Sequence, residues 1–300
     1  MSAKILISGA SGLVGSHLTK QLVASGYQVS HLSRTATGKE KVSTFQWNLK
    51  TMTIDAEAVD VDYIIHLAGA GVADHKWTSS RKQEILDSRV NSTKLLYNTV
   101  KERGVRLKGF ISASAIGLYG LNTGDKLVDE DAPQANDFLA GVVKHWEQEA
   151  NSFESLDIPV TKIRIGVVLA NEGGALPKMK KPIELGVGAP LGSGKQFMSW
   201  IHYRDLCRIF QWAIEEHKPG IYNAVAPIPV TNQQLTRAIA KRIRRPLLLP
   251  NVPSFVLKMM LGEMSGIVLG GNNVSSKKLV DSGFNFEFQD LETALRDLLK

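Results

Sequence analysis

The first 170 residues alternate short apolar runs, rich in β-branched residues, with longer stretches of helical periodicity. The apolar runs are nearly continuous, which is typical of strands that are covered on both faces. Because strands and helices alternate, the pattern predicts a parallel sheet with right-handed crossovers, a doubly wound α/β fold. The predicted strands are 4–8, 28–33, 43–47, 62–69, 109–114 and 160–170, and the predicted helices lie near 13–25, 79–103 and 137–155.

The pattern changes after Leu169. Residues 171–198 are rich in glycine and are interpreted as loop, and three prolines make 244–253 a connector. The division predicted is a nucleotide-binding domain over 1–170 and a smaller C-terminal substrate lobe over 171–300, with strand 221–226 returning to the first domain. The other predicted elements are helices at 203–216, 231–244, 254–262, 275–281 and 290–299, and a strand-like run at 284–288.

Composition limits the setting of the protein. Cys207 is the only cysteine, so no intrachain disulfide forms, which fits a reducing cytoplasm. No run approaches the roughly 18 apolar residues of a membrane-spanning helix, and we expect no membrane partner. The histidines form no pair with metal-ligand spacing, so no metal site is predicted.

The net charge of +7 is unevenly distributed. Residues 1–150 carry 17 basic and 16 acidic side chains, and residues 151–300 carry 19 and 13. The basic runs at 178–181 and 241–245 are interpreted as a solvated face, or as a surface that attracts an anionic small molecule. No nucleic-acid-binding motif is present, so no nucleic-acid partner is predicted. The sequence is compatible with a homodimer.

Three glycines follow the first predicted strand with the spacing G-x-x-G-x-x-G, namely Gly9, Gly12 and Gly15. Glycine permits a tight turn and a close approach of the backbone to a pyrophosphate, which the helix N-terminus then stabilises. A strand before the loop and a helix after it are the context of a Rossmann dinucleotide site. The alternative is a purely structural turn.

The end of the second strand indicates which dinucleotide binds. An NAD site usually places Asp or Glu there for the ribose 2′-hydroxyl, whereas this chain has Ser33 and Arg34. A guanidinium suits a 2′-phosphate, so NADP(H) is favoured over NAD(H). The glycine-lysine pair in 188–197 fails as a P-loop, because Ala189 and Gln196 stand where that motif needs Gly and Ser or Thr.

Several motifs resemble the extended short-chain dehydrogenase/reductases of the NAD(P)-dependent epimerase/dehydratase superfamily. They are "GASGLVG" (9–15), "HLAGAG" (66–71), "SRVNSTKLL" (88–96), "ISASAIGLYG" (111–120) and "SWIHYRDLCRIF" (199–210). The chain is most similar to an atypical branch, called epimerase-family or nucleoside-diphosphate-sugar-epimerase-like proteins, with a distinctive C-terminal segment from about Leu247. With the residues above, the resemblance implies a cofactor site of Gly9, Ser11, Gly12, Leu13, Val14, Gly15, Ser33, Arg34, Leu67, Ala68, Gly69, Arg89 and Ser112.

The pair that performs proton transfer in the superfamily, Tyr-x-x-x-Lys, is missing from its usual helix. The chain has this spacing only at Tyr97–Lys101, on the helix before the serine strand, where an ordinary helix face is expected. On the proper helix, predicted near 137–155, Phe138 is the nearest aromatic residue and Val142 stands four residues later. Candidate catalytic residues are therefore Ser114, with Ser112 as its rival, and Tyr119, Lys144 and His202 as relocated acid or base. Ser114 and Tyr119 are five residues apart, where the family pattern has four.

These observations leave two classes of function open. The first is an NADP(H)-dependent oxidoreductase or epimerase acting on a small polar molecule, with a sugar nucleotide implied by the resemblance alone. Its proton would come from a relocated residue, from water or from the substrate. The second is a non-catalytic protein that senses NADP(H). The sequence favours the enzyme.

Overall fold

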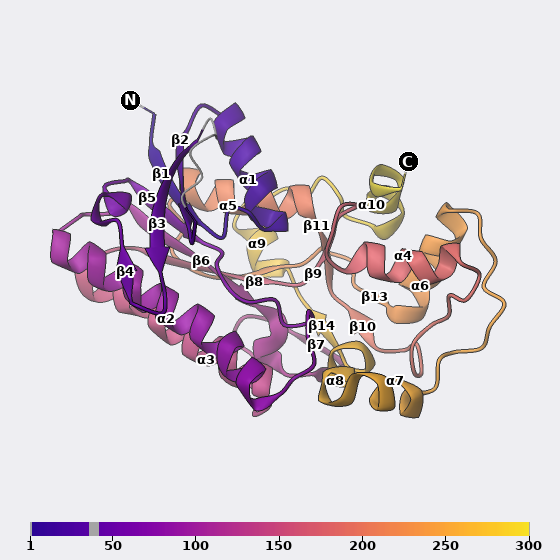
Figure 1. The fold of residues 1–300 in the computed structure, drawn as a ribbon. Coiled ribbons are helices and arrows are strands. Elements are labelled where there is room, and N and C mark those ends of the chain that lie inside the picture. The colour runs from indigo at the N-terminus through magenta and orange to yellow at the C-terminus, as the bar shows by residue number, and fades with distance from the viewer. Residues whose placement is uncertain (1, 36–41, 300) are drawn as a thin grey trace.

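The computed structural model describes residues 2–35 and 42–299. Its main feature is an eight-stranded sheet in the order β12-β8-β6-β5-β1-β2-β3-β4 (Figure 1), in which β4 alone is antiparallel to its neighbour. The strands are β1 Lys4–Ser8, β2 Gln28–Ser33, β3 Ser43–Asn48, β4 Thr53–Ile54, β5 Tyr63–His66, β6 Gly109–Ala115, β8 Val160–Ile165 and β12 Gly220–Ala224.

Helices cover both faces of this sheet. The helices α1 (Leu13–Ala24) and α5 (Tyr203–Glu215) pack on one face, around a core that includes Leu18, Leu22 and Phe210. On the other face, α2 (Ser79–Arg103) and the end of α3 (Phe138–Asn151) enclose a second core. The predicted doubly wound α/β fold is confirmed.

The C-terminal half adds a smaller lobe beside the carboxyl ends of the parallel strands (Figure 1). A four-stranded sheet in the order β13-β10-β14-β7 and a two-stranded pair, β11-β9, join the lobe to the main sheet. Their bounds are β7 Asn122–Val128, β9 Val167–Leu169, β10 Phe197–Met198, β11 Trp200–His202, β13 Val230–Thr231 and β14 Gly271–Val274. The lobe's helices are α4 Ala175–Glu184, α6 Asn232–Arg242, α7 Ser254–Leu261, α8 Ser265–Leu269, α9 Lys277–Asp281 and α10 Leu291–Leu298.

The strand-like run 284–288 forms no strand, so that prediction is wrong. Its three phenylalanines are buried in alternation, as a strand would bury them. The backbone N–H groups of Glu287 and Phe288 donate instead to the carboxylate of Asp205, both at 2.9 Å. A side chain therefore takes the place of a neighbouring strand.

The prediction of loop over 171–198 is also wrong in part, because α4 occupies 175–184 despite two prolines. Leu176 and Ile183 are buried with residues of α6 and α10, so tertiary packing outweighs a poor local propensity. Strands β7 and β14 were not predicted, since their polar sequences carry no strand pattern. The proposed boundary near residue 170 remains a prediction.

Candidate nucleotide site and the buried network beside it

The glycine loop connects β1 to α1 where the strand order changes direction, with β2 on one side of β1 and β5 on the other. Gly9 has φ +73°, and a Cβ there would lie 2.8 Å from the backbone nitrogen of Ala68. A Cβ at Gly15 would lie 2.4 Å from the carbonyl oxygen of Gly9. Only glycine fits at these two positions, and their spacing leaves an exposed backbone turn at Ser11 and Gly12.

The first turn of α1 faces this loop without any acidic side chain and without a side-chain cap on Gly12. Helix N-termini leave backbone N–H groups unpaired and carry a partial positive charge, so this turn, with Leu13 and Val14, suits a phosphate. The loop leaves no room for a Cβ at Gly9 and Gly15, and the first turn of α1 has unpaired backbone N–H groups. Together these two features fit the pyrophosphate of a dinucleotide.

Ser33 and Arg34 lie where β2 ends, as predicted. The Ser33 hydroxyl accepts a hydrogen bond from the backbone N–H of Thr35 at 3.3 Å. The Arg34 side chain is exposed, and within the described ranges no carboxylate pairs with it. An exposed guanidinium at the end of the second strand matches the requirement of a 2′-phosphate.

The end of β5 closes the loop from the other side, because the backbone N–H of Leu67 donates to the carbonyl of Ser8 at 3.1 Å. Next to it lies Arg89 of α2, whose guanidinium would be 3.0 Å from a Cβ on Gly69. Arg89 Nη1 donates to the carbonyl oxygens of Ala70 (3.0 Å) and Ile85 (2.9 Å). Arg89 is thus fixed directly beside the predicted cofactor loop.

Arg89 has no carboxylate partner among the residues that the structure describes. Burial and the repulsion of Arg81 lower the pKa of Arg89 to about 10. Its guanidinium lies 5.1 Å from the ring centroid of Trp146, whose buried indole N–H finds no acceptor in the described part of the chain. Two donors of this kind are expected where an anionic or carbonyl-bearing ligand binds.

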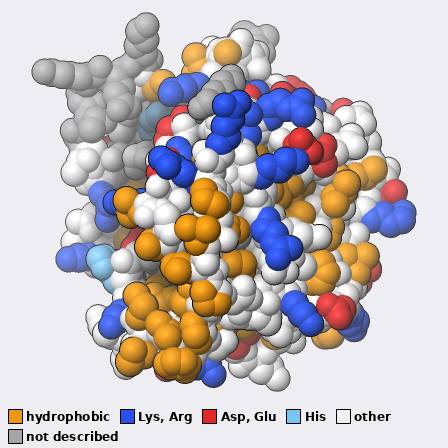
Figure 2. All heavy atoms as spheres, turned by 90° about the vertical axis from the view of Figure 1, so that its right-hand side faces the viewer, with side chains coloured by type: hydrophobic (Ala, Val, Ile, Leu, Met, Phe, Trp, Pro, Cys, Tyr) orange, Lys and Arg blue, Asp and Glu red, His pale blue; other side chains and the backbone are white. Residues whose placement is uncertain are grey.

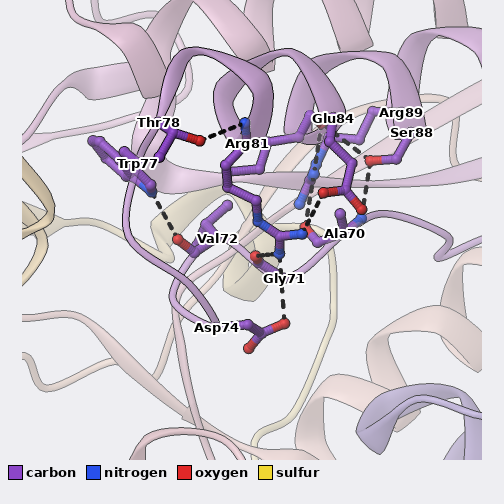
Figure 3. Close-up of polar contacts among 11 residues, drawn as sticks. Ala70, Gly71, Val72, Asp74, Trp77, Thr78, Arg81, Glu84, Ser88 and Arg89 are labelled. Carbon is purple, nitrogen blue, oxygen red and sulfur yellow. Dashed lines mark hydrogen bonds and ion pairs between the residues drawn. The ribbon is translucent and has the colours of Figure 1, made fainter.

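The segment between β5 and α2 is held by short polar contacts (Figure 3). The Trp77 indole donates to the carbonyl of Val72 at 2.8 Å, and Arg81 pairs with Glu84 at 2.7 Å. Trp77 also packs edge-on against Phe138, the first residue of α3. These contacts fix the positions of both side chains.

Ser112, in the middle of β6, is the register neighbour of His66, the last residue of β5, and both are buried. The Ser112 hydroxyl donates to the carbonyl of Ala113, and the side chain is 1 % exposed. His66 bridges Ser8 Oγ (2.6 Å) and Ser92 Oγ (3.0 Å), and burial lowers its pKa to about 3. This chain of hydroxyls and neutral imidazole ties β1, β5 and α2 together beneath the cofactor loop.

Ser114 belongs to a buried polar network that crosses three strands. The register places Ser114 beside Arg164 of β8, and Arg164 beside Asn223 of β12. The Ser114 hydroxyl donates to Glu147 Oε1 at 2.6 Å, and Arg164 binds both oxygens of Glu147 at 2.8 and 3.0 Å. Burial opposes ionisation of Glu147, but Arg164 and Ser114 bring its pKa below the ordinary value.

Tyr119 lies at the other end of the same network. Its hydroxyl donates to Asn223 Oδ1 at 2.7 Å and accepts from Arg164 Nη1 at 2.9 Å. Burial raises the pKa of Tyr119, and the neighbouring Arg164 opposes that rise. Glu130 completes the network by accepting from the backbone N–H of Asn223. The structure therefore connects two of the four predicted catalytic residues, through an arginine.

The other two lie apart from it. His202 is fully buried and starts α5 by accepting from the backbone N–H of Arg204, while its Nε2 lies 3.3 Å from the Asp297 carboxylate. Burial lowers the pKa of His202 to about 4, and Asp297 opposes that change. Lys144 is exposed on α3. No described contact joins either residue to Ser114.

The first two turns of α3 place apolar side chains beside the residues that follow β6. A Cβ on Gly117, which follows β6, would lie 3.7 Å from Leu139 and 4.0 Å from Val143. These two residues have the four-residue spacing of the superfamily's Tyr and Lys, one position along from Phe138 and Val142. Neither can transfer a proton.

Sequence reasoning missed Glu147, Arg164, Asn223 and Glu130. One signal was present, since "VTKIRIGVVLA" places a charged residue in the middle of a buried strand. A charged residue in a buried strand usually has a partner of opposite charge, but the partner of Arg164, Glu147, lies on a helix 17 residues earlier, and spacing does not reveal it.

Comparison with known proteins identifies the family. The pattern of the NAD dependent epimerase/dehydratase family matches residues 5–224, and that of a domain of unknown function, DUF1731, matches residues 252–298. The epimerase family protein YfhF of Bacillus subtilis is 36% identical over 298 residues, covering 98% of this chain and 97% of YfhF.

Solved structures agree. The human epimerase family protein SDR39U1 (isoform 2), crystallised with NADPH, superimposes with a TM-score of 0.86 at 29% identity, covering 99% of both chains. UDP-glucose 4-epimerase of Thermus thermophilus, in complex with NAD, has a TM-score of 0.77 over 99% of this chain and 97% of its own, and at 19% identity shows the fold alone. This chain is an NAD(P)-binding Rossmann protein that belongs to the NAD dependent epimerase/dehydratase family.

Proposed function

We propose that this protein binds NADP(H) in preference to NAD(H) and uses it as an oxidoreductase or epimerase on a small polar molecule. The observation that carries the proposal is Arg34, an exposed cation at the end of β2 where an NAD site has a carboxylate. The NADPH in the crystal structure of human SDR39U1 supports the same cofactor. A sugar nucleotide is the proposed substrate class, because the UDP-glucose 4-epimerases of Thermus thermophilus and Thermotoga maritima share this fold.

The chain's own residues would hold the dinucleotide as follows. The loop from Gly9 to Gly15 and the N–H groups of the first turn of α1 receive the pyrophosphate, and Arg34 receives the 2′-phosphate. Arg89 lies beside Gly69 and Ala70, where its unpaired charge attracts the remaining anionic part of the ligand. When bound, the nicotinamide supplies or accepts a hydride.

Tyr119 is the proposed acid or base in place of the missing Tyr-Lys pair. Arg164 Nη1 lies 2.9 Å from the Tyr119 hydroxyl. Its positive charge would stabilise a tyrosinate, as the lysine does in the superfamily. The Ser114 hydroxyl donates a hydrogen bond to Glu147, so the Ser114 oxygen is left to accept a hydrogen bond from a substrate hydroxyl. Lys144 and His202 remain alternatives, which the turnover of variants at these two positions tests.

The cofactor is tested by titrating the protein with NADPH and NADH while following nucleotide fluorescence. Arg34→Ala should weaken NADPH binding by about 10- to 100-fold and leave NADH binding unchanged, since a charge-assisted hydrogen bond is worth about 1.5–3 kcal/mol. Arg106→Ala, another exposed arginine, is the matched control. Equal affinity for both nucleotides, or no effect of Arg34→Ala, would refute the preference for NADP(H).

A non-catalytic NADP(H) sensor is the second candidate, and the apolar pair Leu139 and Val143 favours it. The two functions are separated by offering the NADP⁺ complex and the NADPH complex, each in turn, a mixture of sugar nucleotides and measuring reduction or oxidation of the cofactor and epimerised product. Turnover that falls at least 100-fold in Tyr119→Phe, with NADPH affinity kept, supports the enzyme and its acid. A similar loss in Lys144→Met or His202→Gln instead would reassign the acid, and binding without any turnover supports the sensor.

A further inference from the structure

A large share of the exposed apolar side chains lies on one edge of the C-terminal lobe. Phe255, Met259 and Met260 of α7 are 70, 76 and 59% exposed, and Leu248 of the preceding connector is 76% exposed. Figure 2 shows hydrophobic side chains gathered on the face that this part of the lobe presents, with Lys and Arg side chains among them. Side chains of this size rarely stay in water in such a group without a partner.

Two loops that are far apart in the chain form one surface here. The connector runs beside residues 190–192, where the Val252 N–H donates to the Pro190 carbonyl and the Gly192 N–H donates to the Val252 carbonyl, both at 2.9 Å. The loop that leads into 190–192 also carries exposed apolar residues, Leu185 and Val187. The patch is therefore a fixed feature of the fold, since backbone hydrogen bonds hold both of its loops.

The stretch of chain that includes the connector and α7 is basic. From residue 217 to residue 262 the chain has seven Lys and Arg residues and no Asp or Glu. Arg244 and Arg245 are exposed at the start of the connector and Lys258 is exposed on α7, and none of them pairs with a carboxylate in the described part of the chain. Arg242 and Arg244 also line a hollow of about 370 Å³, together with the ion pair of Lys180 and Glu184.

We propose that this edge of the lobe, α7 with the connector 244–253, binds the surface of an anionic lipid bilayer. Phe255 and the methionines would enter the boundary between headgroups and acyl chains, while the arginines contact lipid phosphates. A nucleic acid would use the charges but not flexible Leu and Met side chains, and an acidic protein would not need so many exposed apolar groups. The surface attaches the protein to a membrane without crossing it.

This inference is independent of the proposed function and differs from the expectation of no membrane partner. That expectation rests on the absence of a membrane-spanning run, and no helix of the described residues is long and apolar enough to cross a bilayer. Binding at the surface requires only exposed apolar groups beside uncompensated cations.

The test is co-sedimentation of the full chain with vesicles of phosphatidylcholine alone, or mixed equally with phosphatidylglycerol. We expect binding to the mixed vesicles only, weakened by high salt. Arg244→Gln with Arg245→Gln should lower the partition coefficient about 25-fold, about fivefold for each charge. Phe255→Ser with Met259→Ser should lower it at least tenfold, because their apolar surface no longer enters the bilayer.

Matched controls are Leu127→Ser, which changes an exposed leucine on β7, and Lys126→Gln, which removes an exposed charge beside it. Unchanged circular dichroism and NADPH binding verify that each variant folds. Equal binding to neutral vesicles, no binding to either, or equal binding by the patch variants overturns the proposal. The proposal is also overturned if the protein sediments without vesicles and Phe255→Ser abolishes that sedimentation, because the patch would then join two copies of the chain.

Discussion

Gly15 lies where the first turn of α1 packs against the loop that precedes it. A Cβ there would be 2.4 Å from the Gly9 oxygen and 2.6 Å from Ala10 Cα, both backbone atoms that cannot rotate away. The glycine spacing in the sequence is thus explained by close approach as well as by backbone freedom. This is the part of the candidate site that sequence predicts well, because a glycine requirement is a property of one residue and its neighbours.

Gly15→Ala is expected to lower the free energy of unfolding by about 1–3 kcal/mol and to abolish NADPH binding, since the loop must move. Gly141→Ala on α3 is the control, because a Cβ there meets no atom within 4 Å and alanine favours helix. Urea unfolding and the NADPH titration measure both effects. Retained binding in Gly15→Ala would contradict the assignment of this loop.

The network around Arg164 is a property of residues that the sequence separates widely. Its side chains come from β6, β8, β12 and α3, so no spacing rule predicts it.

Glu147→Gln should lower the free energy of unfolding by about 3–5 kcal/mol, because Arg164 is left as a buried charge without a counter-ion. Glu149→Gln, two residues along and part of a 3.7 Å pair with Lys94, should cost less than about 1 kcal/mol. Equal losses would show that burial of the pair is unimportant.

At the scale of elements, the periodicity of the sequence predicted the strands and helices whose formation depends mainly on their own residues. Strands 4–8 and 28–33 and helix 79–103 have the predicted bounds, and the helix is capped by Thr78 and by Gly104 in the left-handed conformation. The failures are elements that depend on a partner. Residues 284–288 look like a strand but bind Asp205, while β7 and β14 look like loop but pair with each other.

Asp205→Ala therefore tests how the C-terminal tail is attached. Two backbone N–H groups lose their acceptor, and we expect a loss of about 2–4 kcal/mol together with faster proteolysis near 284–288. Limited proteolysis with mass spectrometry locates the cuts. The exposed Glu287→Ala is the control, and unchanged cleavage in Asp205→Ala would mean that burial of the phenylalanines alone holds the tail.

At the scale of the whole molecule, two buried histidines connect separate parts of the fold. His66 ties β1, β5 and α2 together at one end of the sheet, and His202 starts α5 against α10. Their pKa values, about 3 and about 4, mean that both are neutral in the folded protein over most of the acidic range. In the unfolded chain each would bind a proton near pH 6.5.

Because the unfolded state binds these protons and the folded state does not, stability falls as the pH drops from 6.5 towards 4. The expected slope is up to about 1.4 kcal/mol per pH unit for each histidine. Urea unfolding between pH 4.5 and pH 7.5 measures it, and His66→Asn, although less stable, should reduce the slope by about one proton. His75→Gln, an exposed histidine, is the control. If His66→Asn keeps the full slope, His66 is protonated in the folded protein and the hydroxyl chain beneath the cofactor loop must be rearranged.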